Sequence, residues 1–131
     1  MTDAPNIVIV NTGVANVRSV ANMLKRIKVA ATISDSVEAV ASADALILPG
    51  VGSFDTCINR LRATGLIEPL NTKALEEGVP ILGLCLGMQI MGNRSEEGEL
   101  PGLGWIPGEL LRLKTETGKT KIRVPHMGWN I

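Results

Sequence analysis

Four short apolar runs constrain the fold of this chain more than any other feature of its sequence. Each has the length of a β-strand, and they occupy residues 7–10, 29–33, 45–48 and 79–84. Runs that are apolar throughout are typical of strands buried on both faces of a parallel sheet. Helix-patterned stretches separate the runs. This alternation predicts an α/β fold with an open, mostly parallel sheet flanked by helices.

Local signals mark where the intervening helices begin and end. Asn16 stands before apolar residues that recur at helical spacing and is a predicted N-cap. Residues 35–38 resemble a capping box that opens a short second helix. Further helices are predicted over residues 54–64, 66–77 and 86–92. The polar residues 115–120, flanked by 109–114 and 121–124, are predicted to form the turn of a hairpin.

Composition argues against several classes of function. Thirteen basic residues balance thirteen acidic ones, which argues against an electrostatic grip on nucleic acid or on an anionic membrane. The longest apolar stretches have strand length, so we expect no membrane span and no secretory signal. Cys57 and Cys85 do not form a disulfide framework, and with one histidine they cannot build a structural zinc site. We therefore expect a cytoplasmic protein with reduced thiols, a single domain over residues 1–131, and no metal or organic cofactor.

One cysteine occupies a position that favours catalysis. Cys85 follows the fourth apolar run in the pattern Gly83-Leu84-Cys85-Leu86-Gly87, the sulfur version of a nucleophile elbow, in which a sharp strand-to-helix turn exposes the reactive atom. The helix that follows directs backbone N–H groups at the sulfur and favours the thiolate. The N–H of Leu86 can also face an oxyanion. The alternative is a structural cysteine between packing glycines, which is the interpretation we prefer for Cys57, on a helical stretch.

A glycine-rich loop follows the third apolar run. Residues 49–52 read Pro-Gly-Val-Gly and leave the same end of the predicted sheet as Cys85. Functional sites of open α/β sheets gather at that edge. Glycines there allow backbone N–H groups, such as that of Gly52, to point inward as oxyanion donors.

These residues resemble a known family. Residues 83–89 resemble the nucleophile motif of class I, triad-type glutamine amidotransferases, and residues 48–54 resemble their oxyanion strand. More narrowly, the chain is similar to the glutaminase subunit of imidazole glycerol phosphate synthase, an enzyme of histidine biosynthesis. The similarity lies in the Gly-Met-Gln that follows the nucleophile and in residues 11–16, 94–98 and 125–130. Asn11 stands where that subunit more usually has an acidic residue. The resemblance covers essentially the whole chain and implies a flavodoxin-like fold.

The resemblance implies a mechanism and a set of site residues. Cys85 would attack the side-chain amide of glutamine and form a glutamyl thioester, ammonia would leave, and water would release glutamate. Gly52 and Leu86 would supply oxyanion donors. Gln89 and Glu97 match positions that hold the glutamine substrate, with Glu96 as the alternative if the loop is shifted by one. Without the resemblance, Gln89 and Glu97 are ordinary solvated residues.

The resemblance also implies a partner. In the family, ammonia passes through a (β/α)₈-barrel cyclase subunit, whose products are imidazole glycerol phosphate and an aminoimidazole carboxamide ribotide. The face toward the barrel would carry Asn16 and the terminal residues His126, Met127, Trp129 and Asn130. Trp129 could instead be a core residue, although Trp is a common interface anchor.

The chain departs from the family in one respect that bears on activity. The family places its catalytic His and Glu close together near its C-terminus, whereas this chain ends at Ile131, and its only histidine, His126, does not match the catalytic position. We therefore expect the N-terminal two-thirds of an amidotransferase domain, an incomplete sheet with exposed apolar surface, and little or no glutaminase activity.

Three other functions compete with this interpretation. The first is a non-catalytic protein that keeps the fold and the partner-binding face. The second is a paralogous amidotransferase that serves another pathway, such as one for surface sugars, because the partner determines the acceptor. The third is a protease-like or chaperone-like relative of the same superfamily, against which Gln89 and the terminal block speak.

Overall fold

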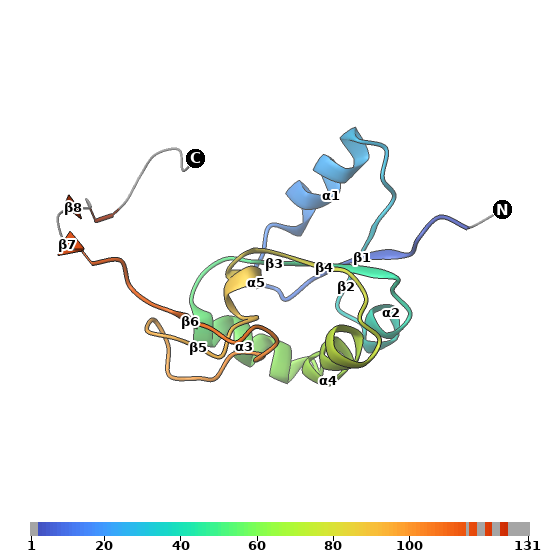
Figure 1. Cartoon of the computed structure of the whole chain (residues 1–131). Helices are drawn as coiled ribbons and strands as arrows, with labels where there is room; N and C mark the ends of the chain where they lie inside the picture. The colour runs from blue at the N-terminus through green and yellow to red at the C-terminus, as the bar shows by residue number, and fades with distance from the viewer. Residues whose placement is uncertain (1–2, 115, 118–119, 122–123, 126–131) are drawn as a thin grey trace.

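A four-stranded parallel sheet forms the centre of the molecule. The computed structural model describes residues 3–114, 116–117, 120–121 and 124–125. The sheet has the order β2-β1-β3-β4, and all three strand pairs are parallel (Figure 1). Its strands are β1 (Ile7–Val10), β2 (Thr32–Ser34), β3 (Ala45–Gly50) and β4 (Ile81–Cys85). The order of the strands reverses between β1 and β3, so the carboxyl ends of these strands flank a topological switch point. The predicted fold class is confirmed.

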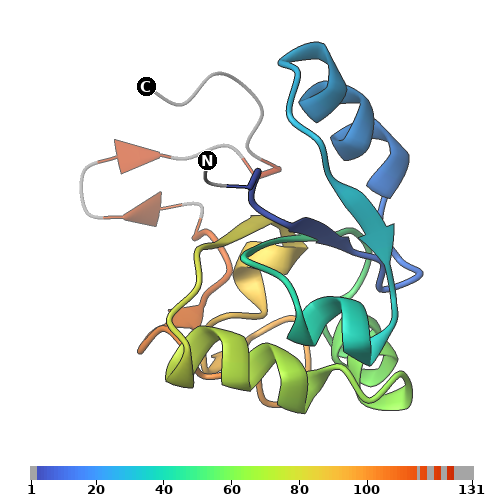
Figure 2. The same cartoon turned by 90° about the vertical axis from the view of Figure 1, so that its right-hand side faces the viewer.

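Helices cover the two faces of the sheet unequally. The helices are α1 (Val17–Arg26), α2 (Val37–Ala41), α3 (Phe54–Ala63), α4 (Ile67–Asn71), the π-helical turn η1 (Thr72–Glu76) and α5 (Leu86–Gln89). Figures 1 and 2 show α1 on one side of the sheet and α2 to α5 on the other. We call the side that carries α1 the α1 face, and the other side the packed face.

The hydrophobic core lies under the packed face. Side chains that alternate along β1 and β3 point into it, because successive residues of a strand face opposite sides. The buried strand residues of this core are Val8, Val10, Leu46 and Leu48. Helix α3 contributes Phe54, Ile58 and Leu61, none more than 1% exposed. Burial of this kind stabilises a fold by about 1.5–3 kcal/mol per large apolar side chain.

Serine and asparagine side chains begin three of the helices. Asn16 caps α1 by accepting a hydrogen bond from Ser19 N at 3.2 Å, which confirms the predicted cap. Helix α2 is capped by Ser36, which accepts from Ala39 N at 3.0 Å. The predicted capping box over residues 35–38 therefore has its cap one residue later, and the third helical position holds Ala39 instead of an acid. Ser53 caps α3 in the same way.

Several predicted boundaries were wrong, for local reasons. The second strand is Thr32–Ser34 instead of residues 29–33. Lys28 adopts a φ of +60°, and the residues after it form the turn that leads out of α1, so the strand begins later. The predicted helix over 66–77 divides into α4 and η1, where Glu77 N donates to Thr72 O at 2.9 Å in a π-helical pattern. Helix α5 ends at Gln89, earlier than predicted.

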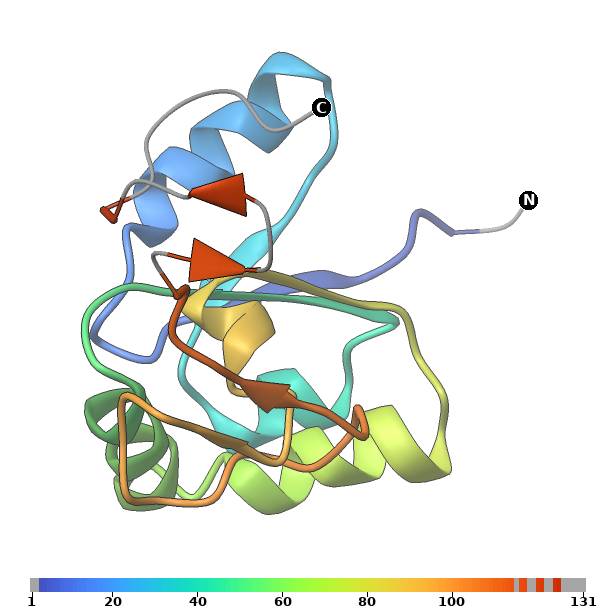
Figure 3. The ribbon, with the colours of Figure 1, turned by 60° about the vertical axis from the view of Figure 1, so that its left-hand side comes forward.

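The remaining strands differ most from the sequence prediction. Strand β5 (Arg94–Ser95) pairs in parallel with β6 (Glu109–Leu110), and β7 (Glu116–Thr117) pairs antiparallel with β8 (Thr120–Lys121). A hairpin therefore forms within the predicted turn, but residues 109–114 are not one of its arms. Residues 109 and 110 instead pair with β5, and within this pairing Arg94 donates two hydrogen bonds of 2.9 and 3.0 Å to the Glu109 carboxylate. Figure 3 shows the segment from β5 to β6 running along the packed side, past α3.

Candidate active site

The turn from β4 into α5 has the geometry of a nucleophile elbow. Cys85 is exposed and sits between strand and helix with φ +55° and ψ −118°. A side chain in this region costs about 1–3 kcal/mol and persists only when its surroundings hold it there. The neighbouring glycines make the turn possible. A Cβ on Gly83 would lie 2.6 Å from Met88 Cα, and one on Gly87 would collide with Leu48 O.

The other cysteine has the opposite environment. Cys57 lies in α3 and is completely buried. Burial raises the pKa of its thiol to about 11, because desolvation disfavours the thiolate. The prediction that Cys57 is a core residue is confirmed.

The glycine-rich loop at the end of β3 lies against this elbow. Gly50 is the register partner of Cys85 across β3 and β4, and a Cβ on Gly50 would lie 2.8 Å from Gly87 N. We call residues 49–52 the oxyanion loop, after the role predicted for it from the sequence. Val51 N donates to Val14 O at 2.8 Å, whereas the Gly52 N–H has no acceptor in the described part of the chain. Gly52 has φ +92°, so its backbone conformation is one that favours glycine.

A cavity at the C-terminal end of α5 brings the predicted substrate residues together, and neither Cys85 nor residues 49–52 line it. Its volume is about 900 Å³, and Gln89, Glu96 and Glu97 are among the residues that line it. Gln89 is the last residue of α5, the helix that begins after Cys85. The two glutamates belong to residues 95–100, which we call the substrate loop, after the role predicted for Glu97 from the sequence. The cavity therefore connects the elbow's own helix to a loop further along the chain.

Hydrogen bonds distinguish the two glutamates of the substrate loop. The Glu96 carboxylate accepts a hydrogen bond from Arg112 N at 2.6 Å. The Glu97 backbone N–H donates to Ser95 Oγ at 3.1 Å, and Ser95 is buried. Glu97 is exposed, and within the described residues its carboxylate has no hydrogen-bond partner. Both oxygens of the Glu97 carboxylate are therefore free of hydrogen bonds from the described residues, whereas one oxygen of Glu96 is engaged.

The sequence analysis missed one residue of this region. Asp55, in the first turn of α3, accepts hydrogen bonds from the backbone N–H groups of Glu99 and Leu100, both at 3.0 Å. These two bonds hold the pKa of the Asp55 carboxyl below its usual value. An acidic residue in a helix's first turn is a common local signal, and nothing in the sequence connects it to a loop so distant along the chain.

The predicted partner-facing residues lie mostly outside the described residues. These are His126, Met127, Trp129 and Asn130. Asn16 is described: it is exposed and begins α1, in the connection whose Val14 O accepts the Val51 N–H of the oxyanion loop. The β1–α1 connection and the oxyanion loop are thus in direct contact.

Within the described residues, no group of three or more His, Cys, Asp or Glu side chains is arranged to hold a metal ion. No helix in that part of the chain has both the length and the apolar character needed to cross a membrane.

Comparison with known proteins finds relatives that agree with the resemblance noted from the sequence. The chain is 47% identical over 124 residues to a Pseudomonas aeruginosa protein named imidazole glycerol phosphate synthase subunit HisH 2. It is 42% identical over 122 residues to the HisH subunit of Bdellovibrio bacteriovorus. These alignments cover 95% and 93% of this chain but 60% of each relative, so the chain spans about 60% of the length of the relatives it matches.

A structural match and a family model both name glutamine amidotransferases. A solved structure described as a glutamine amidotransferase matches with a TM-score of 0.67 over 80% of this chain and 56% of the other. At 24% identity this likeness shows the fold alone. A family model described as glutamine amidotransferase class-I matches residues 8–131. With the elbow and the oxyanion loop side by side at the edge of a parallel sheet, the chain belongs to the class-I glutamine amidotransferase family.

Proposed function

We propose that this chain supplies the nucleophile, the oxyanion donors and part of the glutamine site of a glutaminase. The observation that carries the proposal is the register of β3 and β4, which sets Gly50 beside Cys85. The same register brings the oxyanion loop to a strained, exposed thiol at the carboxyl edge of the sheet, where ligands of open α/β folds bind.

The chemistry follows from these positions. Cys85 Sγ attacks the side-chain amide carbon of glutamine, and a tetrahedral intermediate forms with its negative charge on oxygen. The N–H groups of Gly52 and Leu86 stabilise that charge. The leaving nitrogen takes up the proton that the Cys85 thiol gave up, the C–N bond breaks, and ammonia departs to leave a glutamyl thioester. Water then attacks the thioester, so that one glutamine and one water give one glutamate and one ammonia.

Glu97 and Gln89 hold the substrate in this proposal. Both line the cavity at the C-terminal end of α5, the helix that begins after Cys85. A free carboxylate is suited to the ammonium group of an amino acid, and a side-chain amide can both donate and accept hydrogen bonds. Glu96, the alternative to Glu97, already binds Arg112 N, which supports Glu97 as the substrate residue.

The partner is proposed from the relatives. The proteins from Pseudomonas aeruginosa and Bdellovibrio bacteriovorus are named as subunits of imidazole glycerol phosphate synthase. We propose that this chain acts in the cytoplasm with a (β/α)₈-barrel cyclase, which receives the ammonia for histidine biosynthesis. Asn16 and residues 126–130 would face that cyclase.

Substrate binding can be tested separately from turnover. The rate at which iodoacetamide alkylates Cys85 would be followed by mass spectrometry, with L-glutamine, L-asparagine or no ligand. We expect L-glutamine to slow alkylation and L-asparagine, one methylene shorter, to have little effect. The buried Cys57 serves as an internal control and should stay unlabelled. Equal alkylation of Cys85 at every glutamine concentration would contradict the proposal.

Turnover needs a general base as well as a nucleophile. The sequence holds one histidine, His126, which does not match the family's catalytic position. We expect no steady release of glutamate from glutamine by a polypeptide of these 131 residues. Steady release that disappears in Cys85→Ala would show that a base is present in the chain.

A further inference from the structure

Asp55 makes the contact that joins the two sides of the proposed glutamine site. It lies in the first turn of α3, three positions after Gly52 of the oxyanion loop. Its carboxylate accepts hydrogen bonds from two successive backbone N–H groups of the substrate loop. We infer that Asp55 is a positioning residue, whose carboxylate fixes the substrate loop, and with it Glu97, relative to the oxyanion loop. This inference rests on the proposed function.

The geometry of the contact is bidentate. Oδ2 of Asp55 accepts from Glu99 N and Oδ1 accepts from Leu100 N, each at 3.0 Å. Both oxygens are therefore used, and the carboxylate can rotate away only by breaking both bonds. Hydrogen bonds to an ionised acceptor are roughly twice as strong as those between neutral groups, so a charged group holds this loop better than an amide could.

Gly98 shows how closely the loop approaches Asp55. A Cβ built on Gly98 would collide with Asp55 Oδ1, although the Gly98 backbone is not in the left-handed region. A side chain there would force the Asp55 carboxylate or the loop to move, because the carboxylate occupies the space beside Gly98. The fit between Asp55 and the substrate loop thus depends on residues from both segments.

Glu97 is held from both sides by this arrangement. On its N-terminal side, Ser95 Oγ accepts the Glu97 N–H, and Ser95 O accepts the Gly98 N–H at 3.2 Å. On its C-terminal side, Asp55 binds the two N–H groups that follow Gly98. The Glu97 carboxylate, which has no partner in the described residues, is then presented to the cavity by a backbone fixed at both ends.

Two observations argue against a role limited to the helix terminus. An acid in the first turn of a helix stabilises it through the helix dipole without binding anything else. Asp55, however, directs both oxygens to N–H groups of residues 99 and 100. The N-terminus of α3 is already capped by Ser53, which accepts from Thr56 N at 3.3 Å.

Asp55→Asn provides the direct test. An asparagine keeps the size of the side chain but turns an NH₂ group toward one of the two N–H donors, so one hydrogen bond is replaced by a repulsive contact. We expect the L-glutamine concentration that half-protects Cys85 from iodoacetamide to rise about tenfold. The alkylation rate without glutamine should stay unchanged, because the elbow is untouched. Amide exchange at Glu99 and Leu100 should become faster.

Asp44→Asn is the matched control. Asp44 also binds a backbone N–H, that of Asn6 at 2.7 Å, but it lies at the opposite end of the sheet strands, just before β3. This variant removes the charge of a carboxylate that accepts a backbone N–H bond, whereas the asparagine oxygen can still accept from Asn6 N because only one oxygen of Asp44 is used in the described residues. It should leave glutamine protection at the wild-type value.

Gly98→Ala tests the same contact from the loop and does not depend on how Asp55→Asn folds. The added methyl group should displace the substrate loop and raise the half-protecting glutamine concentration in the same direction. If Asp55→Asn and Gly98→Ala both keep wild-type protection, the inference is overturned while the proposed function stands. If glutamine does not protect the wild-type chain, the proposed function fails and the inference fails with it.

Discussion

The two faces of the sheet differ in how far the described residues cover them. On the packed face, α2 to α5 bury the strand residues almost completely, and Leu46 and Leu48 are at most 1% exposed. On the α1 face, Ile33, Ile9, Ile47 and Leu82 lie side by side in register across all four strands. The inner pair is buried, whereas Ile33 is 37% and Leu82 55% exposed.

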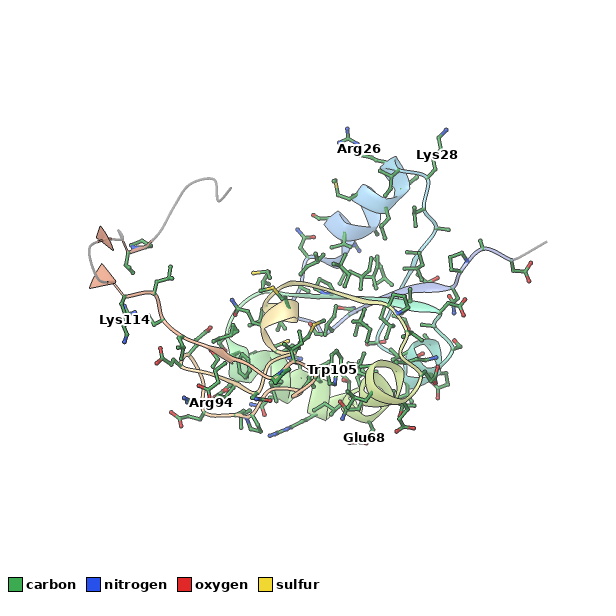
Figure 4. The ribbon with its side chains drawn as sticks, viewed as in Figure 1. Arg26, Lys28, Glu68, Arg94, Trp105 and Lys114 are labelled. Carbon is green, nitrogen blue, oxygen red and sulfur yellow. The ribbon has the colours of Figure 1, made fainter. Side chains whose placement is uncertain are left out.

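The difference shows that an apolar strand residue is buried only where another element reaches it. Helix α1 has no buried residue of its own, and Figure 1 shows it crossing only part of its face. Figure 4 shows Arg26, in the last turn of α1, and Lys28, just beyond its end, directed away from the sheet, while Glu68 and Trp105 lie on the opposite, packed side. In the described residues, the stability of the fold therefore depends mainly on side chains buried on the packed face. The candidate site lies at the carboxyl ends of β3 and β4.

The largest expected effect is on the packed face. Phe54→Ala removes a fully buried ring in the first turn of α3. We expect it to lower the free energy of unfolding by about 3–5 kcal/mol, from lost burial and the cavity left behind. Urea unfolding followed by circular dichroism measures this. A loss below about 1 kcal/mol would mean that α3 does not pack as described.

The second largest expected change in stability concerns the close contact between α5 and β3, also on the packed face. A Cβ at Gly87 would overlap Leu48 O, so Gly87→Ala must shift the helix or the strand. We expect a loss of about 1–3 kcal/mol and a changed alkylation rate at Cys85. Gly108→Ala is the control, because a Cβ there meets nothing within 4 Å. Equal stability of the two variants would contradict the close approach of α5.

Sequence reasoning succeeded where signals are local. The Asn16 cap, the strand-to-helix turn at Cys85 and the burial of Cys57 all follow from neighbouring residues. The unequal faces could not be predicted, because an all-apolar strand has the same pattern whether or not its second face is covered. Asp55 could not be predicted either, since its partners lie 44 and 45 positions away. The arms of the hairpin were wrong because residues 109–110 pair with β5, whose register partners lie 15 positions earlier in the chain.

The third prediction uses pH to probe the packed face. The folded pKa of Cys57 is about 11, above its ordinary value of 9.0, so the folded state binds this proton more tightly than the unfolded state. Its contribution is fully present below about pH 9 and is lost as the pH rises toward 11. Cys57→Ala should remove that part of the pH dependence of urea unfolding. An unchanged slope between pH 9 and 11 would show that Cys57 is not buried in solution.

The smallest expected effect lies on the α1 face, at its uncovered edge. Ile47 and Leu82 are register partners and both point to this face, but Ile47 is 7% exposed and Leu82 55%. We expect Ile47→Ala to cost about 2–5 kcal/mol and Leu82→Ala to change the free energy of unfolding by less than about 1 kcal/mol. Urea unfolding of both variants at the same protein concentration gives the comparison.

A large loss in Leu82→Ala would mean that something covers Leu82 in solution. Repeating the unfolding at several protein concentrations then shows whether Leu82 is covered by a second molecule or by another part of the same chain. A midpoint that rises with concentration identifies a second molecule as the cover, and a constant midpoint identifies a contact within the chain. A small loss of stability in Leu82→Ala at every protein concentration would show that Leu82 stays exposed in solution. Ile47 and Leu82 are of similar size and lie side by side on neighbouring strands. The different costs of the two substitutions would then report how far α1 covers each side chain.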